Sequence, residues 1–536
     1  MELDHWEEEL LEVAGRKLER GEISRRDFMR LVGALGLAAA VPGALAGRAH
    51  AAEAELAQAG NVRFLIAENF WANWEPYQNT AQSQFRINEQ IYDHLVEFPT
   101  GDIGKPRPML ATSWRRLDAR TWEFKLRRGV TFHNGQPFTS RDVKASIELA
   151  SGATKKKTVD AGLFWVPTTV QRIDDHTVRL KTRQPFGALF SALQHSHIVA
   201  AADLEGAAAR LKKQPNGTGP FRLVKDEPNK KTMVRNDKYW RRPAQIRGLV
   251  WEFVQDPQTR LNALLAGQAH AIDRVPPEHL AIIRRNSKLA LASRTGIEMV
   301  NLWVRPGRSQ VWQENANFRR AVNWSIDRDA LVKGLVQGNA RAARSVIPSG
   351  TLYWRPQSPV YDFNPTRAKS ELEAGNLANG GPEFELWVAK GFLPRAVEVV
   401  ESIVNSMQKV GLKPKVRTSD VAGVIDDIFS KTGTGLMYHL SWSSNGDPMT
   451  AFQVYSPAFA WFWGDETIAK LIDDGLKATS PAKRKRVYAT LQAHMWRQNW
   501  HVPLYYSDFT VAHSKRLTGL RVTQNFSTYF YPARLA

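Results

Sequence analysis

The stretch Thr121–Ala150, "TWEFKLRRGVTFHNGQPFTSRDVKASIELA", decides the fold class, because strand and helix signals follow each other within it. Alternating apolar and polar residues over Thr121–Thr139 predict two strands. Asn134-Gly135 is typical of a hairpin turn between them and the next element. Ser140–Ala150 then predicts a helix with Ser140 or Thr139 as its N-cap. We therefore expect α/β architecture.

The same alternation of strands and helices runs outward from this stretch through the chain. Residues 84–98, "QFRINEQIYDHLVEF", have apolar side chains at helical spacing, up to Leu95. Residues 217–221, "GTGPF", predict a backbone bend that leads into a sheet, an architectural role. Residues 435–440, "GLMYHL", predict a buried strand. Such alternation favours α/β domains with mostly parallel sheets.

Composition excludes several kinds of site. The chain has 536 residues, 43% hydrophobic and 24% charged, which is a globular balance with room for two or three domains. It contains no cysteine. Disulfides, thiolate metal sites and cysteine nucleophiles are therefore excluded.

The N-terminus predicts export. Residues 24–29, "SRRDFM", hold a twin-arginine pair, followed by a small-residue apolar stretch and by Ala49–His50–Ala51. This pattern is typical of a twin-arginine signal peptide over residues 1–51 and of a periplasmic mature protein. The apolar stretch is interrupted by Pro42 and is shorter than the roughly 20 residues of a membrane span. A short N-terminal helix or anchor is the alternative.

The charge is strongly basic but dispersed. The whole chain has a formal charge of +20 and residues 1–51 have −2, which leaves +22 for the remainder. The basic runs are short, such as Lys155–Lys157 and Lys483–Arg486, and no nucleic-acid-binding motif accompanies them. We expect scattered surface charge and no nucleic-acid partner.

Several phrases together resemble one family, the family 5 extracellular solute-binding proteins (cluster C) of peptide, opine and nickel ABC transporters. They occur in the family's order and cover nearly all of residues 61–511. The phrases are "RPMLATSWRRLDARTWEFKLRRGVTFHNGQPFTSRDVKASIE", "GTGPFRLV", "RNDKYW", "ALLAGQAHAID", "FRRAVNWSIDRDALVKGLVQGNARAARSVIP" and "WSSNGDP".

The resemblance implies an α/β, two-lobed type II periplasmic binding protein with an extra subdomain in the first lobe and two hinge crossings. The implied divisions are residues 61–90, 216–296 and 500–536 for lobe I, 91–215 for its extra subdomain, and 297–499 for lobe II. The implied function is to capture a small polar solute (peptide-like, opine-like, or another compound with amide or sugar groups) and deliver it to an inner-membrane ABC permease. The resemblance implies no enzymatic activity and no cofactor, and we expect a monomer.

Ligand sites in open α/β sheets lie beyond the carboxyl ends of strands, and three segments fit that position. They are residues 68–77, "ENFWANWEPY"; 388–392, "VAKGF"; and 441–448, "SWSSNGDP". Trp461 and Trp463 follow the third segment and add flat aromatic surface. The candidate ligand contacts are Asn69, Trp71, Trp74, Lys390, Trp442, Ser443, Ser444, Asn445, Asp447, Trp461 and Trp463. Local or core packing is the alternative for each tryptophan.

Two positions depart from the peptide-binding pattern of the family. The resemblance implies that an aspartate which binds the ligand's ammonium group stands at the position of Ser444. It also implies that an arginine which pairs with the ligand carboxylate stands at the position of Lys390. A serine does not neutralise a buried ammonium, and a lysine keeps the charge but loses the bidentate fork. These changes favour an anionic or neutral polar ligand; Asp447 either substitutes for the acid or caps the turn before Pro448.

Three other functions remain open from the sequence, and one of them is a sensory partner of a membrane receptor. "QHSH" predicts His195 and His197 on one face of a strand, and His439 lies near the third segment, so a nickel or metallophore carrier is possible. An exported enzyme is the second alternative, but the chain has no Gly-x-Ser-x-Gly or His-Glu-x-x-His motif and no phosphate loop. The pairs Asp426/Asp427 and Asp473/Asp474 are adjacent in predicted helices, so their side chains point to different faces.

Overall fold

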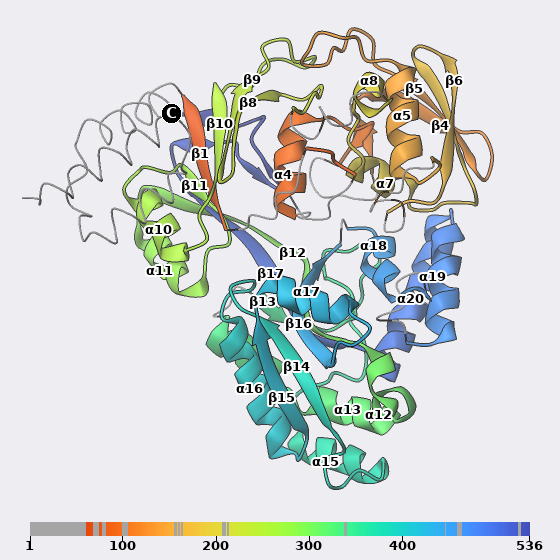
Figure 1. Cartoon of the computed structure of the whole chain (residues 1–536), viewed down its shortest axis with the longest axis vertical. Coiled ribbons are helices and arrows are strands. Elements are labelled where there is room, and N and C mark those ends of the chain that lie inside the picture. Colours follow the sequence, from red (N-terminus) through yellow and green to blue (C-terminus); the bar gives the residue numbers. More distant parts are fainter. Residues whose placement is uncertain are drawn as a thin grey trace, which may run out of the picture. The chain divides into compact units, whose positions relative to one another are not determined.

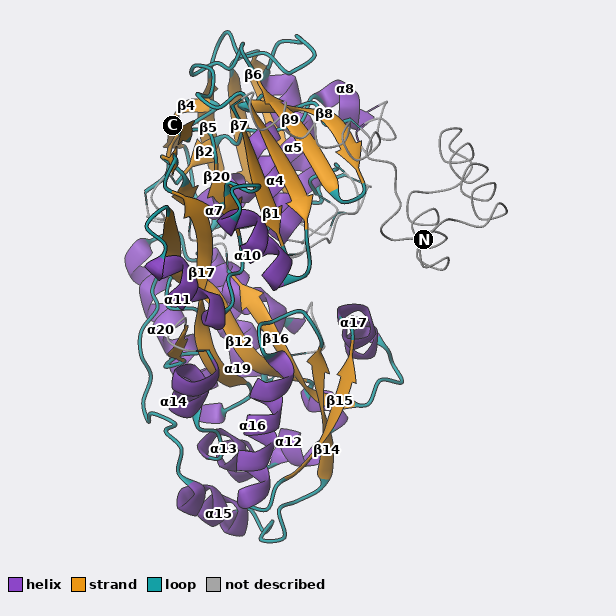
Figure 2. Cartoon of the chain, turned by 90° about the vertical axis from the view of Figure 1, so that its left-hand side faces the viewer, coloured by secondary structure: helices purple, strands orange, loops and turns teal. Residues whose placement is uncertain are grey.

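A mixed eleven-stranded sheet extends through both lobes (Figures 1 and 2). The computed structural model describes residues 60–67, 74–77, 82–98, 105–154, 158, 161, 164–205, 211, 214–336, 340–444, 446–457, 462, 464–523 and 527–536. The first-lobe strands are β1 (Asn61–Ile66), β8 (Phe221–Glu227), β9 (Lys230–Arg235), β10 (Gly248–Phe253) and β11 (Ala271–Ile272). The second-lobe strands are β13 (Ala340–Ala342), β14 (Glu383–Ala389), β15 (Lys413–Ser419) and β16 (Gly435–Ser443). The predicted signal, residues 1–51, lies outside the described residues.

Two long strands, β12 (Leu289–Val304) and β17 (Val502–Ser514), connect the lobes. They pair antiparallel along most of their length, with a register shift between Thr295 and Glu298. On one side of this shift β17 pairs with β11, and on the other side it pairs with β13 while β12 pairs with β16. The two predicted hinge crossings are thus present. Because residues 502–507 pair with second-lobe strands, the structure favours a later second crossing than residue 500, and the lobe boundaries stay predictions.

The prediction of mostly parallel sheets is wrong. Parallel pairing joins β1 with β11, and β14 with both β15 and β16. The strands β8, β9 and β10 instead form an antiparallel meander, and both connecting strands run antiparallel to their neighbours. Strand direction follows from tertiary connections, which local alternation of strand and helix does not specify.

The extra subdomain is an antiparallel sheet covered by a helix. Its strands, in the spatial order β4-β5-β7-β6, are β4 (Ala111–Arg116), β5 (Thr121–Leu126), β7 (Thr177–Thr182) and β6 (Thr168–Asp174). Helix α5 (Ser140–Ala150) begins at Thr139, which forms the predicted N-cap in a capping box with Asp142. The second strand predicted within Thr121–Thr139 is reduced to an isolated bridge between Thr131 and Pro137.

Successive side chains of β1 pack on opposite faces of the first-lobe part of the sheet. Leu65 packs with Leu261 and Leu280, from helices on one face, whereas Phe64 packs against Trp251 and Phe530 on the other. The longer helices are α4 (Gln82–Ile91), α10 (Pro257–Leu265), α11 (Pro277–Arg285), α13 (Ala316–Trp324), α15 (Pro365–Ala374), α16 (Ala396–Lys409), α17 (Val421–Phe429), α19 (Glu466–Lys477) and α20 (Pro481–Gln498).

Short elements complete the fold. The short helices are α7 (Leu189–His195), α8 (Ala201–Glu205), α12 (Gln310–Glu314), α14 (Arg328–Ala330), α18 (Pro448–Phe452), η1 (Pro306–Arg308), η2 (Leu331–Leu335) and η3 (Gln453–Tyr455). The short strands are β2 (Val96–Glu97), β3 (Arg107–Pro108), β18 (Leu517–Thr518), β19 (Arg521–Val522), β20 (Thr528–Tyr529) and β21 (Arg534–Leu535). Leu95 precedes β2 instead of ending a helix, because α4 stops at Ile91.

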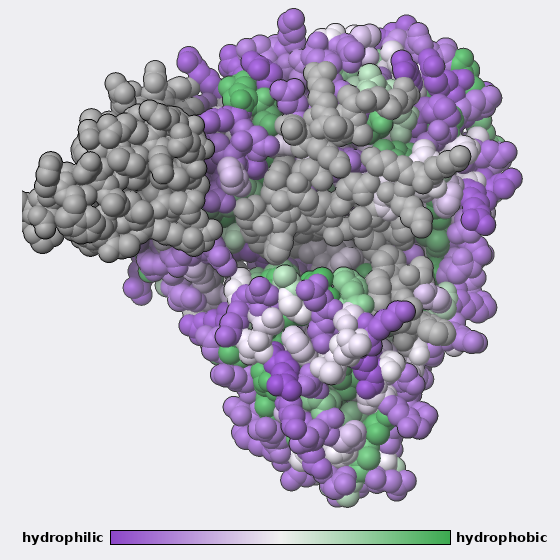
Figure 3. All heavy atoms as spheres, in the orientation of Figure 1, coloured by the Kyte–Doolittle hydropathy of each residue, from purple (hydrophilic) through white to green (hydrophobic). Residues whose placement is uncertain are grey.

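The described surface is largely hydrophilic. Figure 3 shows hydrophilic side chains over much of the visible described surface, on both lobes and on the extra subdomain. Within the described part of the chain, no helix combines the length and the apolar character that crossing a bilayer requires.

Candidate ligand-binding site

A cavity of about 1110 Å³ lies between the two lobes, at the carboxyl ends of four strands. Its first-lobe wall includes Ala67, which follows β1, and Phe253 and residues 255–257 at the end of β10. Its second-lobe wall is made by residues 390–398, which follow β14, and by residues 420–422, which follow β15. The volume is suited to a small solute, and both lobes contribute to it.

The structure places Lys390 in this cavity. Its backbone N–H donates to the carbonyl oxygen of Ser419 at 2.8 Å, which joins the ends of β14 and β15. Its side chain is exposed and lines the cavity. Lys390 therefore lines the cavity after β14, and its contact with a ligand stays a prediction.

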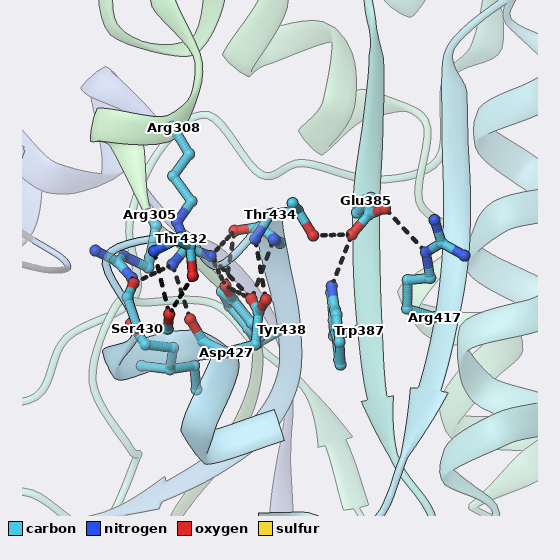
Figure 4. Close-up of polar contacts among 12 residues, drawn as sticks. Arg305, Arg308, Glu385, Trp387, Arg417, Asp427, Ser430, Thr432, Thr434 and Tyr438 are labelled. Atoms are coloured by element: carbon cyan, nitrogen blue, oxygen red, sulfur yellow. Dashed lines mark hydrogen bonds and ion pairs between the residues drawn. The ribbon is translucent and has the colours of Figure 1, made fainter. Parts of the chain in front are cut away.

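Helix α17, whose first turn lines the cavity, is fixed by a partly buried polar network (Figure 4). Asp427 accepts hydrogen bonds from Arg308 at 2.8 Å, from the Tyr438 hydroxyl at 2.6 Å and from two backbone N–H groups. Burial acts to raise the pKa of the Asp427 carboxyl, but these hydrogen bonds outweigh it and hold that pKa below its usual value. Asp427 therefore positions the helix, while its neighbour Asp426 is exposed.

Formal charges in the cavity lining balance. The cations are Arg260, Arg274, Lys390 and Arg395, and the anions are Asp256, Glu278, Glu398 and Asp420. Asp256 caps α10 and Asp420 caps α17, so both carboxylates already accept backbone N–H groups. Arg260 donates to the carbonyl oxygens of residues 254 and 255.

Apart from Lys390, none of the charged residues that line the cavity was predicted from the sequence; they include Arg274, Glu278, Arg395 and Glu398. Arg395 of lobe II lies 3.7 Å from Glu278 of lobe I, an ion pair across the cavity. Arg395 and Arg274 both have left-handed backbone, with φ of 52° and 44°. Non-glycine residues held in this way cluster at ligand clamps. Among these four residues, only Arg395 could have been found from the sequence, because it follows the strand "FELWV" by a few residues.

The segment "SWSSNGDP" is held by polar contacts with neighbouring parts of the chain. Its described residues do not line this cavity. The Trp442 indole is half-buried, donates to the carbonyl oxygen of Thr450 at 3.0 Å and lies edge-on to Trp303. Ser444 is buried, shares a hydrogen bond of 2.9 Å with the Thr351 hydroxyl and accepts the Gly446 N–H at 3.2 Å. Ser443 is half-buried at the end of β16, opposite Glu298 in the ladder. Ligand contacts by these residues stay predictions.

Asp447 caps α18 and forms a buried ion pair. Its carboxylate accepts the Met449 N–H at 2.9 Å and two N–H groups of Arg484 at 2.8 and 3.0 Å. Burial acts to lower the pKa of Arg484, but Asp447 and Tyr488 outweigh it and raise that pKa. The turn-capping alternative for Asp447 is thus the one observed, and Arg484 already neutralises the carboxylate.

Six predicted contact residues remain. One of them is buried in the core, and the other five lie outside the described residues. Trp74 is fully buried, and its indole N–H donates to Asp226 at 2.7 Å, so it occupies a packing position. The five outside the described residues are Asn69, Trp71, Asn445, Trp461 and Trp463.

The first histidine pair of the metal alternative does not lie on a strand as expected. His195 ends helix α7 instead of lying in a strand, and its ring stacks on Phe85 at 4.7 Å between centroids. His439 is buried in β16, where desolvation lowers its pKa to about 4. Across the described ranges, no three His, Asp or Glu side chains are grouped so as to hold a metal ion.

Comparisons with known proteins agree with this architecture. Residues 105–461 match the family model described as bacterial extracellular solute-binding proteins, family 5. The glutathione-binding protein GsiB of Escherichia coli K12 is 27% identical over 497 residues, covering 89% of this chain and 95% of that protein.

Solved structures share the fold at lower identity. A dipeptide-binding protein from Pseudoalteromonas sp. SM9913, in complex with Met-Leu, superposes with a TM-score of 0.77 at 19% identity, covering 89% of this chain and all of that one. NikZ from Campylobacter jejuni, in complex with Ni(L-His), has the same TM-score and identity, with 89% and 99% covered. These relatives are binding proteins, and the chain belongs to the family 5 bacterial extracellular solute-binding proteins.

Proposed function

We propose that this protein is the periplasmic substrate-binding component of an ABC importer for a short, net-anionic peptide of the glutathione type. The observation that carries the proposal is the cavity between the lobes, which offers Lys390 from lobe II and Glu278 from lobe I. Glutathione carries two carboxylates and one ammonium group, so it presents a partner for each charge. The GsiB relatives support this choice of ligand.

The charge balance modifies the ligand expected from the sequence. Ser444 and Lys390 alone favour an anionic or neutral solute, because the acid of the peptide-binding pattern is missing. Glu278 and Glu398 supply acids from other parts of the cavity. A ligand with both charges is therefore favoured, provided that its carboxylates outnumber its amines.

Binding measurements with matched variants test the ligand. Titration calorimetry with reduced glutathione should show one site, and Lys390→Ala should weaken binding about tenfold or more, because a charge-assisted contact is lost. Lys390→Arg should retain most of the affinity. Lys369→Ala, on the exposed face of α15, is the matched control and should change nothing. Binding of Met-Leu that Lys390→Ala leaves intact, or tighter binding of Ni(L-His), would contradict the proposal.

Export by the twin-arginine pathway is part of the same proposal. The pair Arg25–Arg26 in residues 24–29 supports it. Replacing both arginines by lysine should retain the protein in the cytoplasm, as followed by cell fractionation. Secretion of that variant at the normal level would contradict this route. We further propose that the mature protein acts as a monomer that docks on an inner-membrane permease.

A further inference from the structure

The lobes also meet at a second place, away from the cavity, between the extra subdomain and the α19–α20 connection (Figure 1). The Gly187 N–H donates to the carbonyl oxygen of Leu476 at 2.9 Å. The Arg116 guanidinium donates to the Thr479 hydroxyl at 3.1 Å. Gly187 and Arg116 belong to the extra subdomain, whereas Leu476 and Thr479 belong to lobe II. We call this set of four residues the closure contact.

Gly187 is required there for close approach. A Cβ atom at this position would lie 2.0 Å from the carbonyl oxygen of Ala478 and 2.8 Å from both Cδ and Nε of Arg484. All three of these nearest atoms belong to lobe II. The backbone of Gly187 is not in the left-handed region, so alanine would fit its own conformation. A methyl group at residue 187 would therefore oppose the meeting of the lobes and not the folding of the subdomain.

Arg484 connects this contact to the segment "SWSSNGDP". Its side chain forms the surface beneath Gly187 and simultaneously donates two hydrogen bonds to Asp447. Asp447 ends that segment and begins α18. Arg484 is buried, and its cation lies 5.3 Å from the centre of the Tyr488 ring, so little room remains for another rotamer. The position of the segment thus sets the position of the surface on which Gly187 rests.

We propose that Gly187 and Arg484 are positioning residues for ligand capture: the closed state forms only when Gly187 seats on an Arg484 held by Asp447. This proposal rests on the proposed function, because it requires the two lobes to close when the ligand binds. A ligand that stabilises the closed state has an apparent affinity proportional to the fraction of protein able to close. Residue 187 therefore sets affinity without touching the ligand.

Chemical crosslinking across the closure contact tests this directly, because the chain has no native cysteine. Arg116→Cys and Thr479→Cys are introduced together, and the rate of reaction with a short bis-maleimide measures how often the lobes meet. We expect Gly187→Ala to slow this rate tenfold or more. Gly334→Ala is the matched control, because a Cβ atom there meets nothing within 4 Å, and it should leave the rate unchanged.

A second variant and a ligand arm separate the possible outcomes. Near-ultraviolet circular dichroism verifies that Gly187→Ala is folded. Arg484→Lys keeps the charge beside Asp447 but withdraws the guanidinium from Gly187, and should slow the reaction several-fold. An unchanged rate in Gly187→Ala would overturn the proposal. S-methylglutathione, which has no free thiol to consume the maleimide, should raise the rate in the parent double-cysteine protein; no response to it, together with slowing by Gly187→Ala, would overturn the ligand assignment and support the closure contact.

Discussion

Replacing Asp447 by asparagine should destabilise the ligand-free protein, because Asp447 balances a buried cation. Both side chains of the Asp447–Arg484 pair are 5% exposed, and two hydrogen bonds of 2.8 and 3.0 Å join them. Removing one partner of such a pair leaves an uncompensated buried charge and costs about 3–5 kcal/mol. Asparagine retains the N-cap of α18, so the capping energy changes little. We therefore expect a loss of about 3 kcal/mol or more in the free energy of unfolding.

Urea unfolding followed by tryptophan fluorescence measures this loss, with Asp362→Asn as the matched control. Asp362 pairs with Arg344 at 2.8 Å, but its side chain is 67% exposed, so that change should cost less than about 1 kcal/mol. Combining Asp447→Asn with Arg484→Met should recover part of the stability, because the buried charge is removed. If Asp447→Asn kept full stability and lost only ligand affinity, Asp447 would be a ligand contact and the packing argument would be refuted.

Three further predictions follow from buried or bridging groups. His439 has a folded-state pKa of about 4, below its unfolded value near 6.5, because it is buried. Its contribution to stability is therefore complete above pH 6.5, and roughly 3 kcal/mol is lost as the pH falls to about 4. His439→Leu should flatten the dependence of the unfolding free energy on pH between these two values. Trp74→Phe should cost about 1–2 kcal/mol of stability by leaving Asp226 without its indole donor, and calorimetry should show unchanged ligand affinity. Glu278→Gln should weaken binding by less than about tenfold, and the difference from the parent protein should shrink in high salt, because its ion pair with Arg395 is partly exposed.

Local features of the fold were predictable from the sequence because their causes are local. Thr139 caps α5 as expected, since N-cap chemistry depends only on neighbouring residues. The "GTGPF" phrase is architectural as expected, but the reason differs from the expected bend. A Cβ at Gly217 or Gly219 would lie 2.0 or 2.5 Å from the carbonyl oxygen of Ile91, so these glycines are needed for close backbone approach.

Features that depend on distant partners were not predictable from the sequence. The end of α4 at Ile91 follows from that same contact, since the Gly219 N–H donates to the carbonyl of Ile91 at 2.8 Å. His195 and His197 were expected in a strand, but the apolar residues before them form helix α7 on the subdomain. Short apolar segments of this kind do not separate strand from helix by periodicity.

The difference between local and distant causes also explains which positions of the candidate site residues were predictable from the sequence. The position of Lys390 at the carboxyl edge of the sheet was predictable, because this residue directly follows a buried strand. That cause is local and needs no knowledge of distant partners. Asp447 and Trp74 look like exposed binding groups in the sequence. Their partners, Arg484 and Asp226, are 37 and 152 residues away, and only the folded chain brings them together.

The position of each charge bears on which ligand can close the lobes. Ser444 and Asp447 direct their polar atoms to Thr351 and Arg484, so neither is poised to receive an ammonium group. Of the charged residues that line the cavity, Lys390 belongs to lobe II and Glu278 to lobe I. A ligand whose carboxylate pairs with Lys390 and that makes no contact with lobe I would bind one lobe only, and such a ligand does not favour closure. A ligand that also carries an ammonium group would bridge both lobes. Its affinity for the closed state would then exceed its affinity for the open state by more, so the protein would prefer zwitterions to simple anions.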